Sequence, residues 1–125
     1  MTVKSEKKEV GKLVDAIVHG LQEVKGNDIV ELNLEKIPNA ICSRFIICHG
    51  DSSTQVESLA NSVEKEVKKQ LDEKPLHREG VNNAEWIILD YFNVVVHVFQ
   101  KATREFYDLE KLWADAEVKK IEYQI

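Results

Sequence analysis

The stretch that most constrains this chain is residues 86–99, with the sequence WIILDYFNVVVHVF. It is too apolar for a surface strand and too short for the ~20 residues that a membrane helix needs. Residues 86–91 and 94–99 therefore predict two buried strands joined by a tight turn. Asp90 and His97 are polar residues set among the apolar ones. The segment REFYDLEKLW, which follows at 104–113, predicts a short helix that carries several aromatic side chains.

The composition is that of an ordinary folded domain with an acidic balance. The 125 residues are 43% hydrophobic and 31% charged, with a formal net charge of -5. Affinity for nucleic acid comes mainly from Lys and Arg side chains that neutralise phosphates, so we expect no direct sequence-specific nucleic-acid partner. The same charge favours an encounter with a basic protein surface.

The cysteines and the N-terminal sequence indicate an intracellular protein. Cys42 and Cys48 are too few for the disulfide framework of a small secreted domain. The N-terminal MTVKSEKKEV has no apolar core of a signal peptide, and it carries Glu6 and Glu9. We therefore expect a cytoplasmic location and no membrane partner.

Apolar periodicity predicts the order of helices and strands. Helices are expected at residues 5–25, 52–75 and 103–113. Strands are expected at residues 28–34, 44–48, 76–80, 86–91 and 94–99. Ser52 and Gln55 have capping-box spacing, Pro75 ends the second helix, and Thr103 is the expected N-cap of the third. The tail after Ala116 alternates only weakly and is expected to be loose. We predict one α/β domain over residues 1–125, in which a mixed β-sheet is flanked by helices.

Several motifs in this order resemble the ribosomal silencing factor family, also called the Iojap family. The resemblance covers about residues 25–116. Its segments are FIICHG at 45–50 with Ser52, EG at 79–80, WIILDY at 86–91, VVVHVF at 94–99 and REFYDLEKLW at 104–113. Cys42-Ser43 departs from the family's usual Thr-Asp, and Phe92-Asn93 departs from its Gly-Asp at the closing hairpin. Because Phe does not favour positive φ, we expect this turn to be strained or of another type.

The resemblance implies a nucleotidyltransferase-like fold in a protein that is not an enzyme and has no cofactor or metal. Members of the family bind the large ribosomal subunit through the ribosomal protein numbered fourteen, on the intersubunit face. They thereby block joining of the small subunit when nutrients are short. The candidate surface is the hairpin at 86–99 with the helix at 103–113. The implied partner-binding residues are Trp86, Leu89, Asp90, Tyr91, His97 and Tyr107.

Each candidate site residue also has a structural interpretation. Trp86, with Tyr91 near it, is either an interface anchor or an ordinary core residue, and on the first interpretation Trp86→Glu leaves the domain folded and abolishes binding. Either Asp90 and His97 are an acid–base pair, or His97 is a core imidazole satisfied by hydrogen bonding. No activated nucleophile accompanies them, which favours the second interpretation.

Two further clusters have a chemical and a structural interpretation. Residues 49–53 join a strand to a helix and are either a phosphate site or a helix cap, and no pair of strand carboxylates follows to hold a metal. The spacing of Cys42, Cys48, His49 and His97 matches no structural zinc pattern, so buried thiols are expected. The alternatives to a ribosome-binding repressor are a nucleotide-binding or nucleotidyltransferase-type enzyme and a homodimeric scaffold.

Overall fold

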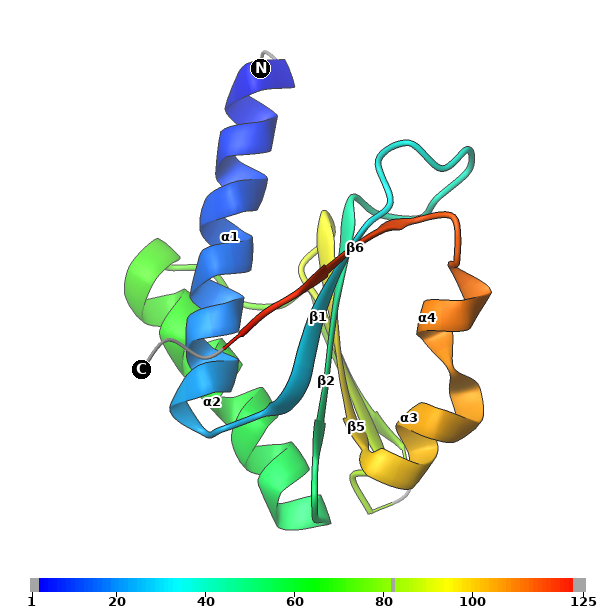
Figure 1. The fold of residues 1–125 in the computed structure, drawn as a ribbon. Coiled ribbons are helices and arrows are strands. Elements are labelled where there is room, and N and C mark those ends of the chain that lie inside the picture. Colours follow the sequence, from blue (N-terminus) through cyan, green and yellow to red (C-terminus); the bar gives the residue numbers. More distant parts are fainter. Residues whose placement is uncertain (1–2, 82, 123–125) are drawn as a thin grey trace.

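A six-stranded sheet with helices on both faces forms the frame of the protein in a computed structural model that describes residues 3–81 and 83–122 (Figure 1). The strands are β1 (Asn27–Asn33), β2 (Arg44–Gly50), β3 (His77–Val81), β4 (Trp86–Asp90), β5 (Val94–Gln100) and β6 (Glu117–Lys120). The helices are α1 (Val3–Glu23), α2 (Ser53–Leu71), α3 (Lys101–Tyr107) and α4 (Leu109–Leu112). The predicted α/β class with a mixed sheet is confirmed.

The order of strands across the sheet is β3-β4-β5-β2-β1-β6. β2 and β5 run parallel, as expected for apolar strands separated by a helix, and the other described neighbours run antiparallel. β4 and β5 form the predicted hairpin, whose turn is closed by the Tyr91 N–H donating to the Val94 carbonyl at 2.9 Å. The hairpin therefore lies inside the sheet, between β3 and β2.

One face of the sheet is covered by α1 and α2, which lie side by side against it (Figure 1). Alternation along the strands directs Ile46, Cys48 and Leu89 to this face, and each of these side chains is fully buried. Helical spacing directs Ile17 and Leu59 to the same core. This layer is the larger of the two hydrophobic cores.

Gly20 sets the distance between α1 and α2. A Cβ atom at Gly20 would lie 2.9 Å from the Val63 Cα atom, and the Ser62 hydroxyl donates to the Gly20 carbonyl at 2.6 Å. We expect Gly20→Ala to lower the free energy of unfolding by about 1–3 kcal/mol, because the helices must move apart. The matched control is Gly11→Ala, which meets nothing within 4 Å and should raise stability by about 0.5–1 kcal/mol. Urea unfolding of both variants checks this, and a shift of the same sign in both would contradict the close crossing.

The opposite face carries α3 and α4 over β5 and β2 (Figure 1). Phe45, Ile47 and Phe99 are buried there, and the half-buried Leu109 and Trp113 pack on them from the C-terminal region. β3 and β4 lie at the far edge of this face. This half of the sheet positions the candidate site.

Most ends of the elements lie within two residues of the sequence-based expectation, but the second helix, the third helix and the tail differ from it. The single helix expected at residues 103–113 is divided into α3 and α4, because Asp108 adopts a left-handed conformation (φ 45°). α2 ends at Leu71 because Asp72 adopts a left-handed conformation (φ 54°), so the helix is already over before Pro75. α3 follows β5 directly at Lys101, and Thr103 is a helical residue instead of the N-cap. The tail after Ala116 forms β6, which pairs antiparallel with β1 through backbone hydrogen bonds.

Candidate functional site

Six side chains from β3, β4 and β5 form a partly exposed patch on the face of the sheet that carries α3 and α4, in which Val95 and His97 are buried. The strand register places Ile88 opposite Glu79 and His97, and it places Asp90 opposite His77 and Val95. His77 and Glu79 are exposed, whereas Ile88 and Asp90 are half-buried. We call this set the open face: His77, Glu79, Ile88, Asp90, Val95 and His97. It is an apolar surface with acidic groups beside it.

The open face is hollowed into a cavity of about 240 Å³. Ile88, Val95 and Phe45 give the cavity an apolar lining, Glu79 and Asp90 add carboxylates, and Ile41 closes one side. His97, which also lines the cavity, is only 6% exposed. A shallow cavity of this kind can bind part of another molecule.

Trp86 lies half-buried beside this cavity and packs in an aromatic cluster. Its ring is stacked on Phe99 with centroids 4.8 Å apart, and the Tyr107 ring lies at the same centroid distance on α3. The Trp86 Nε1–H donates to His97 Nδ1 at 3.2 Å. The indole therefore contributes both to the core and to the rim of the open face, so its replacement disturbs packing as well as the surface.

His97 is held neutral, with one ring nitrogen bonded and the other unpaired. Burial lowers the pKa of its imidazole to about 4. Its Nε2 atom is buried and has no hydrogen-bond partner among the residues that the structure describes. The expected satisfied imidazole is thus found for Nδ1 alone. No hydrogen bond or ion pair joins Asp90 to His97 among the described residues; the Asp90 carboxylate instead accepts the Phe92 N–H at 2.8 Å and caps the turn.

Leu89 and Tyr91 point to the opposite side of the sheet from Trp86. Leu89 is fully buried and Tyr91 is 6% exposed, both in the core beneath α1 and α2. Burial raises the pKa of the Tyr91 phenol, whose oxygen has no hydrogen-bond partner among the described residues. Strand alternation is the reason, because residues 87, 89 and 91 share one face and 86, 88 and 90 the other. This placement leaves Leu89 and Tyr91 out of the surface proposed below.

The turn between β4 and β5 presents Phe92 to solvent. Phe92 has a φ of 73° and is 71% exposed, so its backbone adopts a conformation that costs about 1–2 kcal/mol for a residue with a Cβ. The strain expected from the sequence at this turn is thus present. Ile41, 76% exposed, lines a surface hollow together with Phe92. The two side chains extend the apolar surface beyond the end of the open face.

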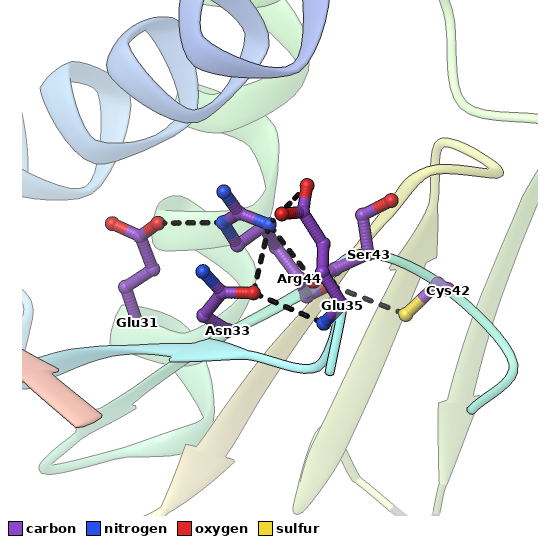
Figure 2. Close-up of polar contacts among 6 residues, drawn as sticks. All are labelled: Glu31, Asn33, Glu35, Cys42, Ser43 and Arg44. Carbon is purple, nitrogen blue, oxygen red and sulfur yellow. Dashed lines mark hydrogen bonds and ion pairs between the residues drawn. The ribbon is translucent and has the colours of Figure 1, made fainter. Parts of the chain in front are cut away.

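The connection between β1 and β2 is tied to the sheet by Arg44, as Figure 2 shows. The Arg44 guanidinium pairs with the Glu31 carboxylate at 3.0 Å and with the Glu35 carboxylate at 2.9 Å. It also donates to Asn33 Oδ1 at 3.1 Å and to the Ser43 carbonyl at 3.1 Å. Because the guanidinium has partners on several sides, this cluster holds the loop that carries Ile41 against the sheet.

A second cavity, of about 570 Å³, lies near the carboxyl ends of β2 and β5. Its lining includes two buried polar residues, His49 and Arg104. The Arg104 Nη1 atom donates to His49 Nδ1 at 2.9 Å and to the Asn27 carbonyl at 3.3 Å. The Arg104 Nε atom pairs with the Glu110 carboxylate at 3.0 Å. Burial, assisted by the Arg104 charge, lowers the pKa of His49. These contacts fasten α3 and α4 to the sheet.

The strand–helix junction at Ser52 is a helix cap. The Ser52 hydroxyl accepts the Gln55 N–H at 3.1 Å, and the Gln55 side chain accepts the Asp51 N–H at 2.7 Å. The capping prediction is confirmed, although the return hydrogen bond comes from the Asp51 N–H, whereas a capping box would use the Ser52 N–H.

Both cysteine thiols are protonated. Burial raises the pKa of the Cys42 thiol to about 11 and that of Cys48 to about 12.

The part of the chain that the structure describes has neither a metal-binding cluster nor a membrane-spanning helix. In residues 3–81 and 83–122, no three His, Cys, Asp or Glu side chains are grouped so that they could hold a metal ion. No helix in the same part of the chain combines the length and the apolar character needed to cross a membrane.

Reasoning from the sequence missed four members of the open face: His77, Glu79, Ile88 and Val95. Ile88 has the same strand parity as Trp86 and Asp90, and this signal was available. The other three depend on the register of β3 and β5 against β4, which the sequence alone does not determine.

Comparisons with known proteins extend over nearly the whole chain. The sequence model of a family described as "Ribosomal silencing factor during starvation" matches residues 6–124. A Halalkalibacterium halodurans protein named ribosomal silencing factor RsfS is 38% identical over 112 residues, which are 89% of this chain and 93% of the relative. A crystal structure of a Chromobacterium violaceum protein has a TM-score of 0.76 at 32% identity and covers 100% of this chain and 94% of that one.

A more distant relative comes from Mus musculus. It is named mitochondrial assembly of ribosomal large subunit protein 1 and is 27% identical over 104 residues. The match covers 80% of this chain and 44% of the relative. The family resemblance inferred from the motifs is confirmed by the closer matches.

Proposed function

Because this chain belongs to the ribosomal silencing factor family, we propose that it binds the large ribosomal subunit and sterically blocks joining of the small subunit under nutrient limitation. The proposed contact is the ribosomal protein numbered fourteen on the intersubunit face, and the proposed place of action is the cytoplasm. The observation that carries the proposal is the family match over residues 6–124. The name of the mouse relative, which refers to the large subunit, supports the choice of subunit.

The proposed contact surface is the open face with the rim formed by Trp86 and Tyr107. A specific protein interface buries roughly 800 Å² on each partner, about a tenth of the 7873 Å² accessible surface of this domain. The open face joins an apolar centre to acidic groups, and the whole chain has a formal net charge of -5. Both features suit a basic protein partner.

We propose recognition in preference to acid–base catalysis at this face. His97 is buried and neutral, and its Nδ1 atom already accepts a hydrogen bond from Trp86. Asp90 is occupied by the backbone of the turn. The two side chains therefore serve separate structural tasks and do not form a pair that could exchange a proton with a substrate.

A subunit-joining assay with purified ribosomal subunits tests the proposal. Wild-type protein at saturation should lower the fraction of joined ribosomes at least tenfold, measured by light scattering. Ile88→Lys should lose this effect, because it places a cation in the centre of a surface proposed to meet a basic partner. The flanking Glu79 and Asp90 can accommodate the Lys side chain in the folded protein.

The matched control is Val118→Lys on β6. Val118 is also a β-branched strand residue, but it is exposed and lies at the other edge of the sheet. This variant should inhibit joining as wild type does. Joining that is undiminished by saturating wild-type protein would reject the proposed function.

A further inference from the structure

The cavity of about 570 Å³ lies where open α/β sheets form small-molecule sites. It borders the carboxyl ends of the parallel strands β2 and β5, because His49 lies near the end of β2 and Lys101 directly follows β5. Ligands of such sheets bind in the crevice beyond the carboxyl ends of the strands. The volume is within the range of roughly 300–1,000 Å³ that is usual for ligand pockets. Position and size therefore both suit a small ligand.

His49 directs a hydrogen-bond donor into this cavity. Burial lowers the pKa of the His49 imidazole, which is therefore neutral. The Arg104 guanidinium can only donate, so His49 Nδ1 is the acceptor in their 2.9 Å contact and the imidazole proton lies on Nε2. Nε2 makes no hydrogen bond with a described residue, yet it is not among the described side-chain atoms that are sealed from solvent without a partner. The Nε2–H therefore opens into the cavity that His49 lines.

Arg104 adds a second donor beside the imidazole. Its Nε atom pairs with Glu110, and its Nη1 atom donates to His49 and to the Asn27 carbonyl. Its Nη2 atom has no hydrogen-bond partner in the described part of the chain and, like His49 Nε2, is not sealed from solvent. Arg104 is 8% exposed and lines the same cavity. Two N–H groups on adjacent side chains can bind the two oxygens of a carboxylate.

Asp28 places a negative charge next to these donors. It lines the cavity with a φ of 47°, at a point where the pairing of β1 with β2 shifts register between Asn27 and Val30. Such a bulge redirects a side chain. The Asp28 carboxylate is close enough for its charge to act on the His49 imidazole, as the Arg104 charge does. A carboxylate and a pair of N–H donors therefore lie side by side in one cavity.

The balance of charge around the cavity restricts the ligand further. Five carboxylates and three cationic side chains line it. A phosphate would bring additional negative charge among these carboxylates, which is unfavourable. A zwitterion brings no net charge, and an α-amino acid carries its ammonium and carboxylate groups on the same carbon atom, so that adjacent groups of opposite sign can bind both. Ile29, Val30 and Ile121 provide an apolar lining for a side chain.

We propose that this cavity binds a free α-amino acid with an apolar side chain. The ligand carboxylate accepts hydrogen bonds from His49 Nε2 and Arg104 Nη2, the ligand ammonium group pairs with Asp28, and the side chain lies against Ile121. The site is separate from the open face, because the two cavities share no lining residue. The inference is also independent of the proposed ribosome binding.

Calorimetric titration with leucine and two blocked analogues tests both charged contacts. Leucinamide lacks the carboxylate and N-acetylleucine lacks the ammonium group. Each should bind about tenfold more weakly than leucine or worse, because a hydrogen-bonded charge is lost. Failure of leucine to bind at millimolar concentrations, or equal binding of leucine and either analogue, would overturn the proposal. Displacement of leucine by inorganic phosphate would identify a general anion site and overturn it as well.

A substitution at Asp28 tests the contact with the ammonium group. Asp28→Asn removes the charge, and Asn tolerates the positive φ of this position. Its affinity for leucine should fall about tenfold, whereas its weak affinity for N-acetylleucine should not change. The matched control is Asp72→Asn, another Asp with positive φ (54°), at the end of α2, and it should bind leucine as wild type does. Equal affinity of the two variants for leucine would contradict the ion pair.

Amide chemical shifts of the wild-type protein locate the bound amino acid. Leucine should shift the signals of residues 28–30, 101–105 and 120–122, which surround the cavity, and leave those of residues 77–81 and 86–90 unchanged. Shifts confined to other segments would overturn the assignment of the site. If Asp28→Asn proves unfolded by circular dichroism, the analogues and the shifts decide. Since no measurement uses ribosomes, failure here leaves the proposed function untouched.

Discussion

Between pH 6.5 and pH 4, His97 alone should lower the free energy of unfolding by about 3 kcal/mol. Burial holds the pKa of the folded imidazole at about 4, against 6.5 for the exposed group. As the pH falls below 6.5, the His97 imidazole therefore becomes protonated in the unfolded chain while it stays neutral in the folded protein. Each tenfold difference in proton affinity between the two states changes the free energy of unfolding by about 1.4 kcal/mol. The stabilisation is complete above pH 6.5, is lost as the pH falls towards 4, and changes no further below that value.

Urea unfolding of wild type and of His97→Gln from pH 7.5 to pH 4 measures this effect. The glutamine side chain does not titrate, so the difference between the two curves isolates His97 from the other acids and bases. His77, Glu79 and Asp90, which line the same cavity, are present in both proteins. His49 has a lowered pKa and remains in both. Parallel curves for the two proteins would show that His97 is not buried in its neutral form.

Arg104→Met should lower the free energy of unfolding by about 2–3 kcal/mol at pH 7. Arg104 is 8% exposed and joins the end of β2, the start of β1 and the helix α4 through His49, Asn27 and Glu110. Methionine preserves much of the apolar contact of the side chain. The decrease in the free energy of unfolding therefore measures the loss of the hydrogen bonds and the ion pair of Arg104. Thermal and urea unfolding, followed by circular dichroism, measure the change.

The control for Arg104→Met is Lys36→Met, which removes an exposed partner of Glu117. Exposed ion pairs contribute about 0–1 kcal/mol, so this change should have little effect. Loosening of α3 should also appear as faster amide hydrogen exchange in residues 101–112 of Arg104→Met. Equal stability of the two variants would contradict the anchoring role of Arg104.

The central elements of the fold follow from local patterns, whereas its edges do not. Apolar runs at residues 44–48, 86–91 and 94–99 predict strands because buried central strands need apolar side chains on both faces. β6 could not be found in this way, since its residues are exposed and include Glu117, Lys119 and Lys120. That strand exists through backbone pairing with β1, an interaction with no local signature.

Only part of the candidate site could be predicted, because local patterns do not show how separate strands pair. Trp86, Asp90 and His97 lie together on the α3/α4 face, as expected for a shared surface, because β4 and β5 form a hairpin. Leu89 and Tyr91 were included although their parity places them on the other face. The unpaired His97 nitrogen depends on the distance to Trp86 across two strands and on the burial of the pair, and neither quantity can be read from a list of residues.

Co-sedimentation with isolated large ribosomal subunits tests the central claim most directly. Wild-type protein should pellet with large subunits at about one copy each and remain in the supernatant with small subunits. Val118→Lys should behave as wild type does, and Ile88→Lys should remain in the supernatant. Failure of wild type to pellet at micromolar concentrations, or pelleting of Ile88→Lys to the same extent, would contradict binding through the open face.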